Sequence, residues 1–215
     1  MELPAWEPRR VVAMGAVLPE GVTPAGTRGR ILKAGLELFA ESGFAGASIR
    51  QIAGIVGINS ATLYAHYPSK GHVLAALVRI GHEEMLARLT EAAAATRDDS
   101  AGRQLAALVR AHVLLHTDYP LLAVVTNSEL HALAPELART SLELREQCRR
   151  MLADVLELGV RTGEFSLDDP MLAVTAIGGL GVQVAQWFGP ALHRTREQVA
   201  DQYAQFALRM AGAHR

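Results

Sequence analysis

The stretch that decides the fold is residues 47–67, which read ASIRQIAGIVGINSATLYAHY. Ser48, followed three residues later by Gln51, forms a capping-box pattern that predicts the start of a short helix. Gly57 ends this helix after about two turns, and Asn59 is suited to cap a third helix over residues 60–67. Apolar side chains at helical spacing give the two helices a common inner face. The pattern predicts a helix-turn-helix, in which one helix is held for insertion into a DNA groove.

The flanking sequence continues this helical pattern in both directions. A helix is expected over residues 27–42, followed by Gly43 as a left-handed cap. Pro68 stops the third helix, and Ser69 begins a long amphipathic helix over residues 70–96. Strand signals are nearly absent, so the chain is expected to be all-α with about nine helices. The remaining helices are expected over residues 101–117, 120–134, 135–162, 170–188 and 195–211.

Composition and charge suggest a basic head on an acidic body. Residues 25–72 carry five Lys and Arg against two Asp and Glu, a net +3, while the rest of the chain is near −4. A phosphate-binding domain joined to a soluble effector domain has this distribution, although a solvated charged face would imitate it. We therefore expect a flexible arm over residues 1–24, a DNA-binding domain over 25–72 and an effector-binding and dimerisation domain over 73–215.

Three features bear on localisation. The single cysteine, Cys148, cannot form an internal disulfide, which suits a reducing cytoplasm. Arg9 and Arg10 precede a short apolar run that weakly resembles a twin-arginine export signal, but nearby Pro and Gly residues favour a flexible arm. The uncharged residues 171–192 are long enough to span a bilayer, yet two glutamines and four glycines favour a helix buried in protein. A cytoplasmic protein without a membrane partner is expected.

The outward face of the helix-turn-helix supplies the candidate DNA contacts. Ser60, Ala61 and Thr62 stand at the exposed start of the third helix, where short side chains allow close approach to base edges. Tyr64 and His66 lie farther along, within reach of phosphates, although either residue alone is equally compatible with packing or solvent exposure. Further phosphate contacts are expected from Thr27, Arg28, Arg30, Ser48, Arg50 and Lys70.

Together these residues resemble the DNA-binding domain of the tetracycline-repressor (TetR) family. The similarity extends from Arg30 through residues 47–67 to Lys70, about a quarter of the chain. It implies that Tyr64, His66 and Lys70 contact the DNA backbone. It also implies that Thr62 and the two residues before it face the groove, and that Tyr67 is a packing aromatic.

The resemblance further implies that the other helices bind a ligand and dimerise, with the last two helices pairing across a two-fold axis. Apolar stripes at helical spacing agree with this, although an intramolecular core would show the same stripes. The expected interface residues are Val174, Ile177, Gly178, Gly181, Val182, Ala185, Phe188, Val199, Tyr203, Phe206 and Met210. Residues 187–190, Trp-Phe-Gly-Pro, resemble a branch of TetR-like regulators that often sense acyl-CoA thioesters or related lipid metabolites.

Candidate effector residues come from the middle helices. His112 and His116 lie four residues apart, a spacing that allows a shared metal, but the spacing fixes no third ligand, so partly buried, hydrogen-bonded histidines are favoured. No metal site and no cofactor is assigned. The candidate cavity walls are His112, His116, Val125, Asn127, His131, Met151, Val155 and Trp187, for each of which ordinary core packing is the alternative.

No nucleophile with a base, carboxylate pair or phosphate-cradling glycine loop occurs at an interpretable spacing, so an enzyme is not expected. The helix-turn-helix residues and the family resemblance together imply a homodimeric repressor that would bind double-stranded operator DNA and be released by a small-molecule effector. The alternative is a DNA-binding structural or adaptor protein that responds to no ligand.

Overall fold

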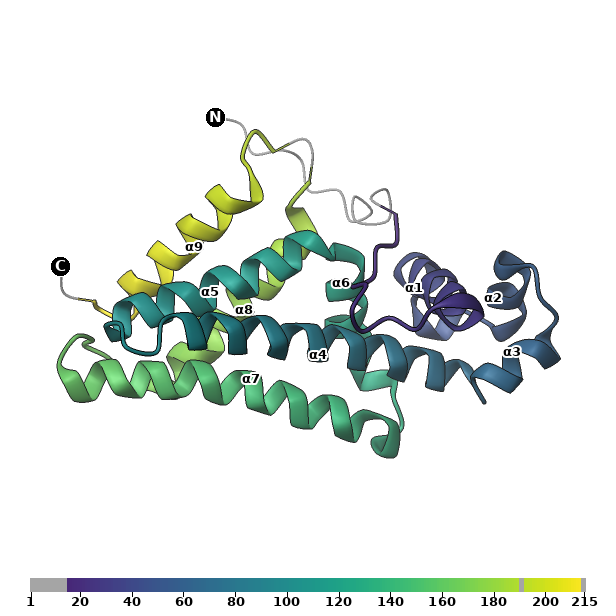
Figure 1. The fold of residues 1–215 in the computed structure, drawn as a ribbon, viewed down its shortest axis with the longest axis horizontal. Coiled ribbons are helices and arrows are strands. Elements are labelled where there is room, and N and C mark those ends of the chain that lie inside the picture. The colour runs from purple at the N-terminus through teal and green to yellow at the C-terminus, as the bar shows by residue number, and fades with distance from the viewer. Residues whose placement is uncertain (1–14, 190–191, 214–215) are drawn as a thin grey trace. The chain divides into compact units, whose positions relative to one another are not determined.

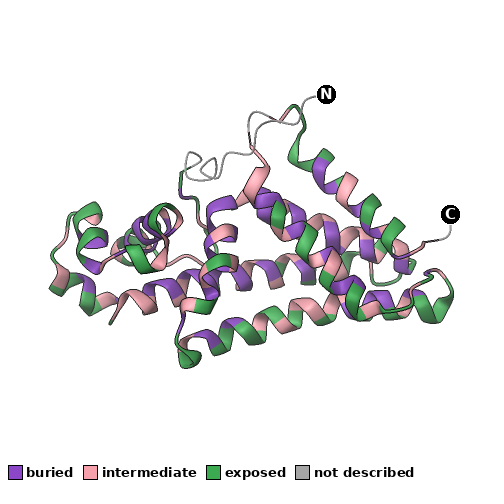
Figure 2. Cartoon of the chain, turned by 180° about the vertical axis from the view of Figure 1, so that it is seen from behind, coloured by how far each residue is buried: buried purple, intermediate pink, exposed green. Residues whose placement is uncertain are grey.

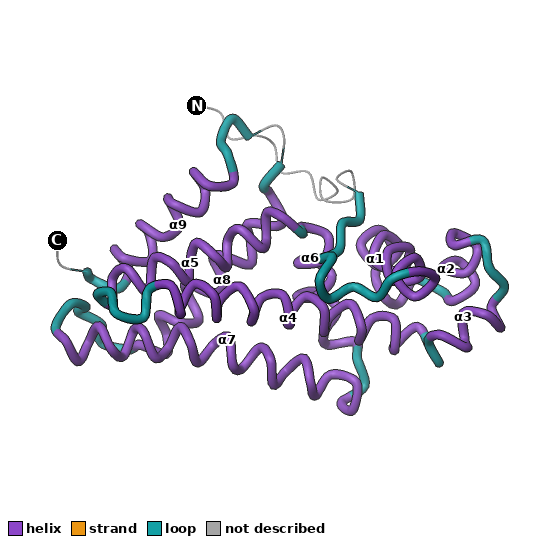
Figure 3. The backbone as a smooth tube through the Cα atoms, in the orientation of Figure 1, coloured by secondary structure: helices purple, strands orange, loops and turns teal. Residues whose placement is uncertain are grey.

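The protein is built from helices throughout the part that the computed structural model describes, residues 15–189 and 192–213 (Figures 1 and 3). These residues contain nine α-helices and no strand, so the all-α prediction is confirmed. The helices are α1 (Gly26–Gly46), α2 (Ile49–Val56), α3 (Ser60–His66), α4 (Lys70–Ala95), α5 (Ala101–Asp118), α6 (Pro120–Glu129), α7 (Pro135–Thr162), α8 (Pro170–Trp187) and α9 (Arg196–Met210), with a 3-10 turn, η2 (Leu130–Ala132), after α6.

Two boundaries differ from those predicted. The first helical segment continues to Gly46 but is interrupted at Gly43, whose φ of 69° and ψ of 166° are not helical. This conformation is readily available to glycine, and beyond it the ring of Phe44 lies 5.7 Å from that of Phe39. The helix predicted to reach residue 134 ends at Glu129, because the chain tightens there into the 3-10 turn η2.

The chain forms two compact units. The first unit contains residues 15–82, Tyr119–Ser141 and Ala185–Gly189, and the second contains Glu83–Asp118, Leu142–Val184 and residues 192–213. The domain expected over residues 25–72 lies within the first unit, which also includes α6. Helices α4, α7 and α8 each contribute residues to both units.

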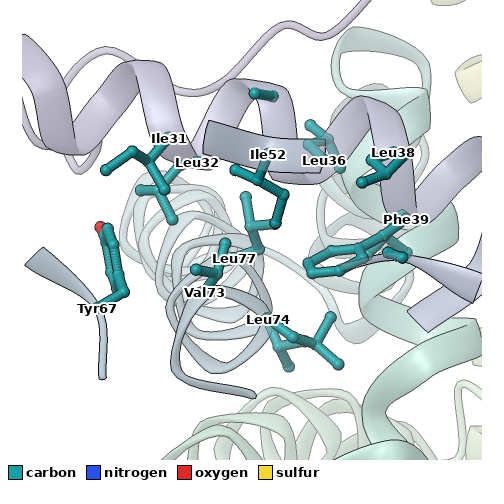
Figure 4. Close-up of a cluster of buried hydrophobic side chains, with 14 of the residues drawn as sticks. Ile31, Leu32, Leu36, Leu38, Phe39, Ile52, Tyr67, Val73, Leu74 and Leu77 are labelled. Carbon is teal, nitrogen blue, oxygen red and sulfur yellow. The ribbon is translucent and has the colours of Figure 1, made fainter. Parts of the chain in front are cut away.

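The core of the first unit holds the helix-turn-helix in place (Figure 4). Helix α1 packs against α2 and α6, and α2 packs against α3. Each fully buried Leu or Ile side chain contributes about 1.5–3 kcal/mol of transfer free energy. The fully or almost fully buried side chains include Ile31, Leu32, Leu36, Phe39, Ile52, Leu63, Val73, Leu74 and Leu77.

Small residues allow two close helix approaches within this unit. A Cβ added to Gly35 would lie 2.8 Å from Cγ1 of Val73, so α1 and α4 touch at that point. A Cβ added to Gly81 would lie 2.7 Å from Oγ1 of Thr126, so α4 and α6 are equally close there. Larger side chains at either glycine would force the helices apart.

The second unit is joined by contacts between residues far apart in the sequence. Helix α5 packs along α9. Asp118 accepts a hydrogen bond from Arg88 at 2.7 Å and forms a second ion pair with Arg196, while Arg110 pairs with Asp201. The last helix begins as predicted with a full capping box. Its N-cap, Thr195, accepts a hydrogen bond from the backbone N–H of Gln198 at 3.2 Å, and the Gln198 side chain accepts one in return from the backbone N–H of Thr195.

Burial along the chain follows helical amphipathicity, with buried and exposed residues alternating along the helices (Figure 2). None of the described helices combines the length and apolar character needed to cross a bilayer, including α8. The arginine pair at residues 9 and 10 lies outside the described residues.

Candidate nucleic-acid interface

The turn between α2 and α3 is built as the sequence predicted. Gly57 adopts a left-handed conformation with φ of 74° and ψ of 34°, and its backbone N–H donates to the carbonyl oxygens of Ala53 and Gly54. The Asn59 side-chain oxygen then accepts a hydrogen bond from the backbone N–H of Thr62 at 2.8 Å. This contact fixes the first turn of α3 and therefore the direction of the helix.

Half of the capping box predicted for α2 is present. Ser48 Oγ accepts a hydrogen bond from the backbone N–H of Gln51 at 3.3 Å. The Ser48 hydroxyl also donates to Gln51 Oε1 at 2.7 Å, so the glutamine side chain is engaged by the hydroxyl. Ser48 is therefore occupied within its own helix start.

Helix α3 has a buried side and an exposed side. Leu63 is completely buried and Tyr67, which follows the helix, is 4% exposed. Ala61, Thr62 and Tyr64 are exposed, with Tyr64 at 51%, while Ser60 and His66 are partly exposed. The burial of Leu63 and Tyr67 confirms that these two side chains attach α3 to the core, and it leaves the predicted groove-facing residues accessible.

Three arginines that precede α3 in the sequence have exposed side chains. Arg28 and Arg30 are exposed at the start of α1, and Arg50 is exposed at the start of α2. Arg30 donates to the Thr27 hydroxyl at 3.2 Å, and the Arg28 guanidinium lies 5.4 Å from the centroid of the Tyr67 ring. Guanidinium groups keep their charge at all physiological pH values and present several donors suited to phosphate oxygens.

Lys70 has a structural role that the sequence did not reveal. Its ammonium donates to the carbonyl oxygens of Phe44 at 2.7 Å and Ala47 at 2.9 Å, and lies 4.4 Å from the centroid of the Phe44 ring. These contacts tie the end of α1 and the residue that follows it to the start of α4. The partners lie 23 and 26 residues away, beyond the reach of any local sequence pattern. We therefore leave Lys70 out of the set of proposed phosphate contacts.

The two histidines of α5 lie together in the second unit. The rings of His112 and His116 are stacked with centroids 4.6 Å apart, and His116 Nδ1 lies 2.8 Å from the His112 carbonyl oxygen. Burial, and then the neighbouring His116, lower the pKa of His112 well below its usual value, so its imidazole is neutral at pH 7. Its Nε2 is buried without a hydrogen-bond partner. A Cβ on Gly181 would lie 2.9 Å from this nitrogen.

The other expected cavity residues divide between the units. Val125 and Asn127 belong to the first unit; Val125 is buried, and Asn127 donates to the Ala123 carbonyl at 2.8 Å. Trp187 also lies in the first unit, 6.5 Å from the Phe188 ring centroid, whereas half-buried Met151 and buried Val155 lie in the second. His131 is exposed on η2, which does not suit a cavity wall. Among the described residues, no three His, Cys, Asp or Glu side chains group to hold a metal ion.

Two family models match the chain. The model described as "Bacterial regulatory proteins, tetR family" matches residues 31–77, and that described as "Tetracyclin repressor-like, C-terminal domain" matches residues 98–211, more than half of the chain. The chain belongs to the TetR family. The resemblance of its helix-turn-helix to this family is confirmed, and members of the family are DNA-binding transcriptional regulators, not enzymes.

Individual TetR-family proteins are similar over nearly the whole chain. The HTH-type transcriptional repressor KstR2 of Rhodococcus jostii is 28% identical over 184 residues, covering 85% of this chain and 90% of the relative. A solved TetR-family regulatory protein from Rhodococcus RHA1 is 30% identical with a TM-score of 0.83, covering 89% of this chain and all of that one. AibR, solved with isovaleryl coenzyme A and operator DNA, is 21% identical, covers 86% of this chain and 97% of its own, and shares the fold with a TM-score of 0.74.

Within this TetR-family chain, the predicted dimer stripe is partly internal. Val174, Ile177, Gly181, Ala185 and Val199 are buried in the single chain, as the alternative of an intramolecular core expected. Gly178, Val182, Phe188 and Tyr203 are half-buried, and Phe206 and Met210 are exposed at 39% and 38%. The exposed apolar surface of α8 instead includes Leu172 at 65% and Leu180 at 43%, neither of which was predicted. Because α8 carries no charged residues, its sequence has no polar side that would indicate which face points outward.

Proposed function

We propose that this TetR-family regulator is a repressor that binds operator DNA through the exposed side of α3. The observation that supports it most is the division of α3, with Leu63 fixed in the core and Thr62 and Tyr64 accessible beside it. Ser60, Ala61 and Thr62 enter the major groove, where short side chains permit contact with base edges. Tyr64, His66, Thr27 and the arginines at the starts of α1 and α2 contact phosphates.

Two copies of the chain bind a palindromic operator. The exposed apolar residues Leu172 and Leu180 of α8 and Phe206 and Met210 of α9 supply a surface for a second copy, because large apolar side chains left in water favour association. Two recognition helices then enter successive major grooves roughly 34–36 Å apart. Binding is steeply salt-dependent, because each phosphate contact releases condensed counterions.

The proposed effector is an acyl-CoA or a related lipophilic metabolite that binds near His112. The imidazole is neutral and buried, and its Nε2 has no hydrogen-bond partner, so a ligand that displaced the packing of this nitrogen against Gly181 would satisfy it. Helix α4 contributes residues to both units, so a ligand that favours one position of this helix changes the placement of the recognition helices. AibR, which shares the fold, was solved with isovaleryl coenzyme A and operator DNA, and this supports the ligand class.

Fluorescence anisotropy with a duplex selected from a random library tests the DNA contacts. Thr62→Val is expected to change the preferred sequence, because base contacts specify. Arg50→Gln is expected to weaken binding on every sequence by a similar factor and to reduce the salt slope by about one. A protein that shows no preference among duplexes, with unchanged binding in both variants, would contradict the proposal.

Sedimentation tests the dimer separately. Leu180→Glu places a charge on the exposed side of α8 and is expected to raise the dimer dissociation constant, while Leu142→Glu, at another exposed leucine, serves as the matched control. Titration of acyl-CoA thioesters of increasing chain length into the protein–operator complex then tests the effector. Release of DNA by one of them separates a ligand-responsive repressor from a structural DNA-binding protein, which none would release.

A further inference from the structure

An ion-pair network in the second unit joins three helices. Asp118, the last residue of α5, accepts a hydrogen bond from Arg88 of α4 at 2.7 Å through Oδ2. Its other oxygen, Oδ1, pairs with Arg196, the first residue of α9. Glu84, one turn before Arg88 on α4, accepts a hydrogen bond from the same guanidinium at 2.8 Å. Each oxygen of the Asp118 carboxylate therefore binds a different helix.

The network lies close, along the chain, to the points where the chain passes from one unit to the other. The second unit includes α5 as far as Asp118, and the first unit resumes at Tyr119. On α4 the first unit ends at His82, two residues before Glu84. The four residues of the network all belong to the second unit. Asp118 therefore holds α4 soon after this helix leaves the unit that carries α3.

The ion pair between Asp118 and Arg88 is partly shielded from solvent. Their side chains are 17% and 24% exposed, whereas those of Asp99 and Arg103, a surface ion pair, are 36% and 77% exposed. Salt screens a partly buried pair less than an exposed one, and the planar guanidinium donates in fixed directions. The contact with Asp118 therefore restricts where α4 lies against the end of α5.

Helix α9 is fixed to α5 at more than its first residue. The two helices pack along each other, and Arg110 of α5 pairs with Asp201 of α9. Helix α9 also carries Phe206 and Met210, two of the exposed apolar residues in the proposed dimer surface. Asp118 thus ties α4 to a helix that belongs to this surface.

We propose that Asp118 is a positioning residue for operator recognition. By holding α4 to the start of α9, it keeps the two recognition helices of a dimer at one separation. The inference rests on the proposed function, a dimer that binds a palindromic operator. Asp118 contacts no DNA and acts through α4, which contributes residues to both units. The dimer accepts a narrow range of half-site spacings, because a shift of α4 against α9 breaks a partly buried ion pair.

The test measures how strongly the full chain discriminates between half-site spacings. Fluorescence anisotropy gives the dissociation constants for a selected operator and for two duplexes with one base pair added or removed at its centre. Each change moves the half-sites by about 3.4 Å and rotates them by about 35° relative to each other. The ratio of the altered to the selected dissociation constant is the spacing ratio, and a duplex with one half-site reports the contacts of a single recognition helix.

Asp118→Asn keeps the size of the side chain but removes its charge. It is expected to lower the spacing ratio about fivefold, a typical small coupling between distant sites, and to leave binding to the single half-site unchanged. Asp118→Glu keeps a carboxylate and is expected to retain most of the ratio. Arg196→Gln removes only the α9 partner and is also expected to lower the ratio, which provides the test if Asp118→Asn does not fold. Asp154→Asn, at an exposed aspartate of α7, is the matched control and keeps the wild-type ratio.

The outcomes separate this inference from the function on which it rests. The positioning role is overturned if Arg196→Gln discriminates between spacings as the wild type does. It is equally overturned if Asp118→Asn weakens binding to every duplex by the same factor, the single half-site included, as a loss of stability would. A wild type that binds all three spacings equally well overturns the positioning role alone and leaves operator binding intact. A wild type that binds no duplex contradicts the proposed function and the inference together.

Discussion

The starts of α3 and α5 both need partners for free backbone N–H groups. Helix α3 has a local cap, whereas α5 combines a local one, Ser100 Oγ accepting from the Arg103 N–H at 3.3 Å, with a distant one. Helix α3 is capped by Asn59, three residues from the N–H group that it accepts. Helix α5 is capped by Glu164, whose two carboxylate oxygens accept from the backbone N–H groups of Ala101 and Gly102 at 3.1 and 3.2 Å, over 60 residues away. The Asn59 contact can be predicted from the local sequence, whereas the Glu164 contacts cannot, because they join residues far apart in the chain.

The largest expected effect tests the local pattern that fixes α3. Leu63→Ala removes a completely buried side chain and is expected to lower the free energy of unfolding by about 2–5 kcal/mol. Chemical denaturation measures it, and DNA binding should fall in parallel because α3 is no longer held. Ile55→Ala, at a position 56% exposed in α2, is the control and should change stability by less than about 0.5 kcal/mol. Equal effects of the two changes would show that the burial pattern is wrong.

Sequence reasoning recovered the helix-turn-helix because each of its determinants acts within a few residues. Ser48, Gly57 and Asn59 all occupy the conformations or make the contacts expected of them. It did not foresee the contacts of Lys70 with the carbonyls of Phe44 and Ala47, nor that part of the apolar stripe predicted for the dimer interface on α8 is buried within the single chain. Helix α8 is uncharged along its length, so periodicity alone does not distinguish packing against α5 from an exposed apolar surface.

The next largest effect is expected at Lys70. Its replacement tests a contact between residues far apart in the sequence within the first unit. Lys70→Met keeps most of the apolar side chain but leaves the carbonyls of Phe44 and Ala47 without their donor. We expect a loss of about 1–3 kcal/mol in the free energy of unfolding. Lys33→Met, at an exposed lysine of α1, is the matched control. An unchanged stability together with a smaller salt slope for DNA binding would return Lys70 to the phosphate contacts.

Replacement of Asn59 tests the local cap of α3, for comparison with the long-range contacts of Lys70. Asn59→Ala removes the acceptor for the Thr62 N–H and is expected to cost about 1 kcal/mol. Asn59→Asp keeps an acceptor oxygen and should restore most of the stability. Thermal unfolding followed by circular dichroism distinguishes the two variants. A loss as large in the aspartate variant as in the alanine variant would mean that the cap does not determine the start of α3.

Glu164 gives the smallest effect, visible chiefly in its dependence on pH. The hydrogen bonds from Ala101 and Gly102 hold the pKa of this carboxyl below its usual value of 4.5 in the folded protein. The unfolded chain therefore binds the proton more readily, so the carboxylate stabilises the fold above pH 4.5 and loses this effect as pH falls through the folded pKa. Glu164→Gln should be less stable than the wild type at pH 7, and the difference should shrink towards pH 3. Glu157→Gln, at an exposed glutamate of α7, should show no such convergence. If the stability difference between Glu164→Gln and the wild type did not change with pH, the effect would come from packing and not from the carboxylate charge. The Glu164 carboxylate would then not act as a long-range cap of α5.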